Sequence, residues 1–209
     1  MTEPGTTERR GRSDWTLMNA QHDAFRRDLD DLLATSAGRS AVRARWTVFR
    51  DQLRFHHTAE DEAMWPPVRA KLTSDPAGLA LMDAMEDEHK LIDPLLAAID
   101  DALAAGTGDK RLRSLLSRLR TALARHLAHE EADALPLISE VMSHAELTRI
   151  RKAIAKMSGL KSAAVMFPWA LSTARPEVRA QVLAQLPAPA RFLYRAIWLP
   201  RYRRAAPPL

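Results

Sequence analysis

Hydrophobic residues recur at alternating steps of three and four in four separate stretches of the chain. This spacing places them on one face of an α-helix, and no stretch alternates with the period of two that is typical of a half-buried strand. Turn residues separate the stretches at 36–38, 73–76 and 106–108. The stripes contain, in chain order, Trp15, Met18, Phe25, Leu29 and Leu32, then Val42, Trp46, Phe49, Leu53 and Met64, then Met82, Met85, Ile92, Leu96, Ile99 and Leu103, then Leu112, Leu116, Leu119 and Leu123. The pattern predicts an all-α fold, an antiparallel up-down-up-down four-helix bundle with additional short C-terminal helices.

The same pattern divides the chain into three parts. Residues 1–13 are polar and rich in turn formers, so we expect a flexible N-terminus. Residues 14–141 carry the four stripes and form the predicted bundle. Residues 142–209 are rich in proline and aromatic residues and are predicted to be a basic helical extension, with short helices over 177–186 and 188–199.

Prolines near the ends of the second and fourth stripes are expected to disturb those helices. Pro66 and Pro67 follow the second stripe, and Pro136 follows the fourth. A proline inside a helix lacks the amide hydrogen and crowds the carbonyl four residues earlier. We therefore expect a kink in the last turns of the second helix and an interruption of the fourth at Pro136.

The net charge of +5 is unevenly distributed along the chain. Residues 159–209 hold eight lysines and arginines against one acidic residue, Glu177, whereas residues 1–158 hold 23 basic and 25 acidic residues. The basic charge therefore belongs to the extension, where basic residues lie beside aromatic ones. Such a surface suits a protein partner or an anionic membrane, and no helix-turn-helix or RNA-binding signature favours nucleic acid.

A second interpretation of the extension is that its apolar residues dock on the bundle while its arginines face water. The residues that would dock are Val178, Leu183, Leu193 and Trp198. We favour docking, and a contact with another protein or with a membrane surface stays open.

The chain has no cysteine, which excludes disulfides, thiolate zinc sites, iron–sulfur clusters and cysteine nucleophiles. The N-terminus lacks the apolar segment of a secretory signal, and no apolar run approaches the roughly 18 residues of a membrane-spanning helix. We therefore expect a cytoplasmic protein.

Polar residues interrupt the apolar stripes at positions that face the core, where an unpaired carboxylate is costly to bury. These residues are His22, His56, Glu60, His89, His126 and Glu130. Measured from the predicted turns, the four histidines lie 15 to 19 residues along their helices. In an up-down-up-down bundle these similar distances put the imidazoles within about 6 Å of one level, at about 1.5 Å of rise per residue. We therefore expect the six side chains to converge on one spot.

The spacing and the donor types point to metal binding. His56 and Glu60 are four residues apart, as are His126 and Glu130, so each pair shares one helix face. Nitrogen and oxygen donors without sulfur suit iron, zinc, manganese or copper better than calcium or magnesium. Six ligands exceed the needs of one tetrahedral zinc, so two metals bridged by the carboxylates are the simplest interpretation. A metal-free polar network is the alternative.

The sequence also repeats itself. The segment from His56 to Pro66 aligns without a gap on the segment from His126 to Pro136, and a helix with a single histidine precedes each segment. This pattern resembles a hemerythrin-like (HHE cation-binding) domain of the non-classical bacterial type over residues 14–141. The resemblance implies two non-haem iron ions with an oxo or hydroxo bridge, held by the four histidines as terminal ligands and by the two glutamates as bridging ligands. Other transition metals stay open.

The residues around the predicted ligands receive separate interpretations. Oxygen-carrying hemerythrins have a further histidine one turn after the one on the third helix, and this chain has Asp93 there. That departure counts against a carrier role, and we interpret Asp93 as a polar residue at a proline kink rather than a ligand. His57 and His129 lie off the stripes, so we expect them to be solvated or to contact ligands without binding metal. We interpret Asp61 and Glu131 as exposed charges.

The resemblance implies a protein that binds or senses O₂, NO, peroxide or iron. One alternative is a di-iron oxidoreductase that acts on peroxide or another small oxidant, and another is a metal-free helical interaction module. No general base or nucleophile stands out besides the ligands themselves, so we do not favour an enzyme and assign no catalytic residue.

Overall fold

The computed structural model describes residues 14–106 and 108–205, which form helices and turns without a strand among them. The all-α prediction is therefore confirmed. None of the helices in these two ranges is both long enough and apolar enough to cross a membrane. In chain order the elements are α1 (Thr16–Ala34), α2 (Arg39–Ala59), η1 (Glu60–Met64), α3 (Trp65–Lys71), α4 (Pro76–Ala104), α5 (Asp109–His129), η2 (Glu130–Ala134), α6 (Leu135–Val141), α7 (His144–Leu171), α8 (Pro176–Gln185), α9 (Ala188–Leu193), η3 (Tyr194–Trp198) and α10 (Leu199–Ala205), where η marks a π-helical segment.

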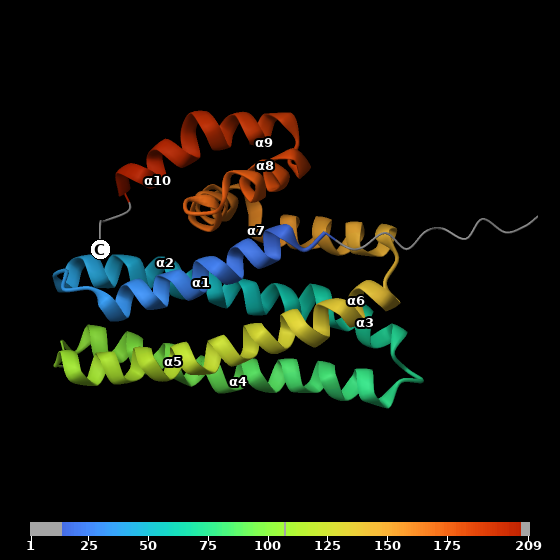
Figure 1. Cartoon of the computed structure of the whole chain (residues 1–209), viewed down its shortest axis with the longest axis horizontal. Coiled ribbons are helices and arrows are strands. Elements are labelled where there is room, and N and C mark those ends of the chain that lie inside the picture. Colours follow the sequence, from blue (N-terminus) through green and yellow to red (C-terminus); the bar gives the residue numbers. More distant parts are fainter. Residues whose placement is uncertain (1–13, 107, 206–209) are drawn as a thin grey trace, which may run out of the picture.

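The long helices α1, α2, α4 and α5 lie side by side and form the body of the molecule (Figure 1). Helix α1 contacts α2 and α5, and α4 contacts α5 and α2. Their buried faces are the predicted stripes, because a spacing of three and four keeps the apolar side chains on one side of each helix. The flexible N-terminus that we expect over residues 1–13 lies outside the described residues.

The apolar interior consists of two clusters. The larger one includes Phe25, Phe49 and Leu96, and the smaller one includes Trp65 and Met85. Along α2, α4 and α5 and their continuations, the residues of one cluster give way to those of the other, and polar side chains lie in between. The core is therefore divided by a buried polar layer.

Three of the helices widen into a π-helical turn before a proline, whereas Pro94 and Pro168 lie inside the α-helices α4 and α7. Within the described residues, each π-helical segment ends two residues before a proline, which is Pro66 for η1, Pro136 for η2 and Pro200 for η3. In η1 the amide of Trp65 donates to the carbonyl of Glu60, five residues earlier. The wider turn accommodates a residue that has no amide hydrogen and crowds the preceding turn. The expected interruption at Pro136 was wrong, since α6 continues the helix beyond it.

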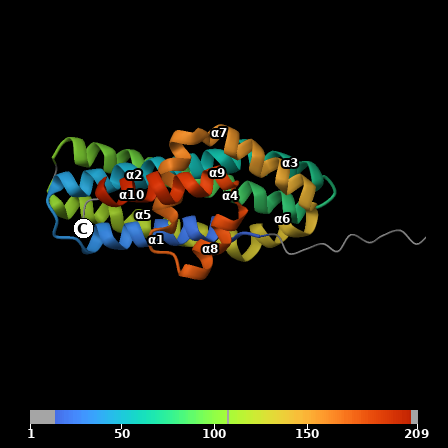
Figure 2. The same ribbon diagram turned by 90° about the horizontal axis from the view of Figure 1, so that it is seen from above.

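The extension begins with a long helix that the apolar stripes did not predict. Helix α7 starts at a capping box, in which the Ser143 hydroxyl accepts from the Glu146 amide and the Glu146 carboxylate accepts from the Ser143 amide. Gly159 then interrupts the helical geometry with a φ of 64°, a conformation that glycine adopts without strain. Beyond this bend the chain turns back over α1 and α2 (Figure 2).

The second part of the extension docks on the larger apolar cluster, as we favoured from the sequence, while Leu147 and Ile150 of its first part belong to the smaller cluster. Leu183 and Trp198 are buried, and Val178 and Leu193 pack against the cluster with partial exposure. The second short helix predicted over 188–199 is replaced by α9, η3 and α10, which together reach residue 205. The basic side chains Arg201, Arg203 and Arg204 stay exposed.

A buried carboxylate on α1 ties this extension to the core. Asp28 is fully buried and accepts hydrogen bonds from Arg27 at 2.7 Å and 2.9 Å, from Arg45 of α2 at 2.8 Å and from the Trp169 indole of α7 at 2.8 Å. A buried charge is tolerated only when such donors surround it. Asp28 therefore joins three helices through one side chain.

Replacing Asp28 with asparagine should lower the free energy of unfolding by about 3 kcal/mol, because the largely buried guanidinium of Arg27 loses its counter-charge and that of Arg45 keeps only Asp31. Urea denaturation measures this change. The matched control is Asp30→Asn on the same helix, where the ion pair with Arg120 is more than half exposed and its loss should cost less than about 0.5 kcal/mol. Equal effects of the two substitutions would contradict the assignment.

Candidate metal centre

The six polar residues that interrupt the stripes come together in the buried layer. Each of the helices α1, α2, α4 and α5 supplies one histidine, and each glutamate is the first residue of a π-helical segment. All six side chains belong to residues that are at most 4% exposed. The six residues are His22, His56, Glu60, His89, His126 and Glu130.

The four imidazoles form two pairs that turn their Nε2 atoms inward. The Nε2 atoms of His22 and His56 lie 3.2 Å apart, and those of His89 and His126 also lie 3.2 Å apart. Glu60 lies between the pairs, with Oε1 3.1 Å from the Nε2 of His56 and Oε2 3.4 Å from the Nε2 of His89. One carboxylate therefore faces both pairs.

The buried carboxylates do not find hydrogen-bond donors within the described residues. Neither oxygen of Glu60 or of Glu130 has one, although imidazole nitrogens lie close by. Burial and the charge of Glu130 raise the pKa of Glu60 to about 8. Because unpartnered buried carboxylates are costly, their convergence with inward imidazole nitrogens fits a site for a cation.

The ligand atoms of this layer fall into two groups among the described residues, and within each group the atoms lie within 4.8 Å of one another. Each group combines donors that iron, zinc, manganese and copper accept. The first group is His22, His56, Glu60 and Glu130, and the second is His57, His89 and His126.

Carboxylates on the outer side hold the imidazoles in this orientation. An Nδ1–H that donates to a carboxylate leaves the lone pair of Nε2 pointing inward in the neutral ring. The bonds run from His22 to Glu131 at 2.8 Å, from His89 to Asp61 at 2.9 Å and from His126 to Glu88 at 3.0 Å. Asp61 is exposed, as interpreted from the sequence, and Glu131 is partly exposed. Each carboxylate nevertheless reaches a histidine on another helix, which the interpretation did not include.

These bonds connect the two repeats crosswise. His22 of the first repeat bonds Glu131 of the second, and His89 of the second repeat bonds Asp61 of the first. Asp61 and Glu131 occupy equivalent positions, since each directly follows the glutamate of its repeat. Each repeat therefore orients the single-histidine helix of the other.

In each imidazole pair the pKa of one ring is raised and that of the other is lowered. Burial would lower the pKa of His22, but the charge of Glu130 and the Glu131 hydrogen bond raise it to about 9. The pKa of His56 is lowered well below its usual value by burial and by the charge of His22. Hydrogen bonds to Asp61 and Glu60 likewise raise the pKa of His89 to about 9 against the effect of burial, and burial and the charge of His89 lower that of His126. The two cationic rings are therefore faced by Glu130, Glu131 and Asp61.

Three neighbours of the centre can now be placed. His129 is partly exposed and donates from Nδ1 to Glu88 at 3.0 Å, as expected for a residue that contacts the ligands from outside. Asp93 is exposed, in agreement with its interpretation as a polar residue at a proline. His57 is only 4% exposed, so the solvated position expected for it was wrong. Its ring contacts His89 and His126, as expected for a residue beside the predicted ligands.

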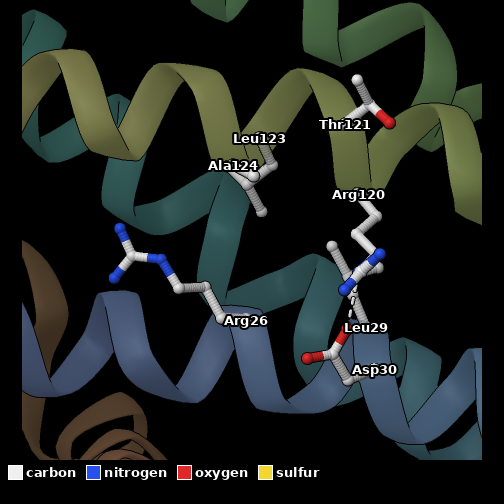
Figure 3. A pocket seen from close by; sticks show the side chains of 7 residues that line it. All are labelled: Arg26, Leu29, Asp30, Arg120, Thr121, Leu123 and Ala124. Atoms are coloured by element: carbon white, nitrogen blue, oxygen red, sulfur yellow. Dashed lines mark hydrogen bonds and ion pairs between the residues drawn. The ribbon is translucent and has the colours of Figure 1, made fainter.

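A groove of about 410 Å³ lies between α1 and α5 and is lined by side chains of both helices (Figure 3). In this groove Arg120 reaches across to Asp30, and Arg26 points away from that pair along α1 (Figure 3). The Nη2 of Arg26 donates to Glu131 at 2.9 Å, and the same carboxylate oxygen bonds His22. A hydrogen-bonded chain therefore connects the groove to the buried layer.

Replacing Glu131 with glutamine should weaken metal binding about 10- to 100-fold, because His22 loses the charged acceptor that fixes its ring. Competition titration against a chelator measures the dissociation constant. Glu62→Gln is the matched control. Glu62 lies in η1, the π-helical segment that corresponds to η2, and its side chain is exposed. If Glu131→Gln bound metal with the affinity of the wild type, Glu131 would have no role in the site.

Comparison with known proteins agrees with the geometry. Residues 13–138 match the hemerythrin HHE cation binding domain, which is more than half of the chain. No curated protein and no solved structure matches the chain. The matched region contains all six residues of the layer, and the resemblance seen in the sequence is confirmed. The chain belongs to the hemerythrin HHE cation-binding domain family.

Proposed function

We propose that this chain binds two non-haem iron ions in its buried polar layer and uses them to bind or sense a small ligand such as O₂, NO or peroxide. We further propose that α1, α2, α4 and α5 form the antiparallel up-down-up-down bundle expected from the sequence. The observation that carries the proposal is the position of Glu60, whose two oxygens face one imidazole from each pair. Membership in a cation-binding family supports it.

In this proposal each imidazole pair holds one iron ion. His22 and His56 serve one ion, and His89 and His126 serve the other. Glu60 would be shared by the two ions, and Glu130 would contribute from the side of His22, where its Oε2 lies 3.2 Å from the imidazole Nε2. Iron held by such ligands supplies an Fe(II)/Fe(III) couple and an open coordination position.

The surrounding residues have their own tasks. The two apolar clusters enclose the layer from both ends. The outer carboxylates hold the rings in place, which lowers the cost of organising the ligands when a cation binds. Because the rings that bind a cation must be deprotonated, the two cationic imidazoles release their protons on loading.

The first test is iron content. The chain, reconstituted anaerobically with Fe(II) and desalted, should retain about two iron ions, and the oxidised protein should show a ligand-to-metal absorption band on addition of azide. Absence of both retained iron and the band would leave the metal-free interaction module as the better account. Rapid turnover of peroxide by the loaded protein would favour the oxidoreductase, whereas a stable, reversible NO or O₂ adduct supports a sensor.

Glu60→Gln should separate metal binding from folding. Glutamine has the same shape and adds no buried charge, so the metal-free variant should fold with a melting temperature close to that of the metal-free wild type. Iron should raise the melting temperature of the wild type, because a ligand that binds only the folded state stabilises it, and should raise that of the variant much less. Differential scanning calorimetry with and without iron measures both effects, with Glu62→Gln as control. An equal increase in both proteins would refute the bridging role.

A further inference from the structure

The extension carries exposed apolar side chains that its docking on the bundle leaves uncovered. Five large hydrophobic side chains are exposed within the described residues, and four of them belong to the extension. Leu160 is 65% exposed and Phe192 is 67% exposed. Single apolar residues are ordinary on a protein surface, so the chemistry around them decides whether they form part of a binding surface.

The surroundings of these side chains are basic. From residue 147 to residue 209, Glu177 is the single acidic residue, against twelve lysines and arginines. Within the described ranges, the fully exposed lysines and arginines between residues 152 and 161 and between residues 195 and 204 form no ion pair with a carboxylate. These residues are Lys152, Lys156, Lys161, Arg195, Arg201, Arg203 and Arg204. Their positive charge is therefore available to a partner.

Two of the apolar side chains flank the bend in α7. Gly159, which makes the bend, is exposed, and apart from its own helix backbone and its chain neighbours no atom lies within 4 Å of the place where a Cβ would be. Met157 and Leu160 lie on either side of this open bend, and both are exposed. Lys156 and Lys161 follow immediately outside them. The bend therefore presents apolar side chains between two positive charges.

The last helices repeat this combination. Tyr194 and Trp198 are buried in the larger apolar cluster, whereas Phe192, Arg195 and Arg203 of the same segment are exposed. Helices α8, α9 and α10 lie beyond α1 and α2, on the side of the bundle opposite to α4 and α5 (Figure 1). Figure 2 looks onto the extension from this side. Basic and apolar side chains are thus exposed together on one side of the molecule.

We infer that this side of the extension is a docking surface for an anionic lipid membrane. Lysines and arginines near a bilayer are attracted to anionic headgroups, and apolar side chains between them enter the interface. The charge favours an anionic partner. The exposed Leu160 and Phe192 favour a bilayer over a nucleic acid, because phosphates offer no contact to an apolar side chain.

A bilayer also suits the distribution of the apolar side chains. They belong to two separate places, the bend of α7 and helix α9, and a fluid surface can meet such places without a fitted shape. The surface lies outside the buried polar layer, so the inference does not depend on metal binding. It places the whole bundle beside a membrane, with the extension between them.

Co-sedimentation of the full chain with vesicles tests the inference. Vesicles of phosphatidylcholine with about 30% phosphatidylglycerol are compared with vesicles of phosphatidylcholine alone, at low salt and at about 0.5 M NaCl. The chain should bind the anionic vesicles at low salt and the neutral vesicles much more weakly. The higher salt should release most of the bound protein, because it screens the charges on both surfaces.

A matched pair of double variants locates the charges that bind. Lys156→Gln combined with Lys161→Gln should weaken binding about 20- to 30-fold, since each basic residue near an anionic bilayer contributes about a fivefold factor. Lys110→Gln combined with Arg118→Gln removes the same charge from exposed positions of α5, on the far side of the bundle. This control should change binding less than about threefold, because its charges lie beyond the screening distance from the membrane.

A second matched pair tests the apolar contact. Leu160→Gln should weaken binding about 10-fold, because the side chain no longer gains from leaving water. Leu91→Gln is the control, since Leu91 of α4 is 69% exposed and lies away from the extension, and it should bind as the wild type does. All these positions are exposed, so the melting temperatures of the variants should equal that of the wild type.

A label at the bend measures insertion directly. Because the chain has no cysteine, Leu160→Cys introduces a single attachment point for an environment-sensitive fluorophore. Its emission should shift to shorter wavelength when anionic vesicles are added, as expected for a label that leaves water. The same label on Leu91→Cys should not respond.

Three outcomes would overturn the inference. The first is no binding to anionic vesicles at low salt, which leaves the proposed function untouched. The second is an equal effect of each variant and its control, which would place the contact elsewhere on the molecule. The third is wild-type vesicle binding by Leu160→Gln together with displacement of the wild type by duplex DNA, which would make the surface a site for polyanions in general.

Discussion

The burial of imidazoles and carboxylates in the middle of an apolar core is the constraint on which the structure depends. The layer divides the interior into two clusters, so each helix must carry its polar residue at the same depth as its neighbours. Burying such groups opposes folding unless opposite charges and hydrogen bonds surround them. Asp61, Glu88 and Glu131 meet this need from the outer side of the rings, and a cation would meet it from the inner side.

Much of this arrangement was predictable from the sequence, because helical spacing determines which residues share a face. The stripes identified the long helices, and the similar distances from the turns brought the six residues to one level. The outer role of Asp61 and Glu131 was not predictable from spacing, because their side chains leave the stripe and reach another helix. The burial of His57 was not predictable for a related reason. The helix that covers this side of α2 is determined by how the helices pack. The start of α7 did have a local signal in Ser143 and Glu146.

The extension shows the same limit of sequence patterns at a second place. Asp28 follows Arg27 in a run of charged residues, which is typical of a solvent-exposed helix face. In the structure it is enclosed because α7 returns over α1 and brings the indole of Trp169 to it. A residue 141 positions away thus converts an ordinary surface charge into a buried anchor. The burial of the apolar side chains in the extension was predictable, because apolar side chains are stabilised by removal from water.

The crosswise bonds between the repeats have a consequence for the order in which the protein folds. His22 and the carboxylate that orients it are 109 positions apart in the chain, so their contact forms only after a very long loop has closed. Contacts of such high sequence separation are late events in folding. A half-length nascent chain leaving the ribosome would carry His22 and His56 without the carboxylates of the second repeat. In the proposed function, metal binding would therefore require the second repeat to have docked, and metal loading would follow synthesis instead of guiding it.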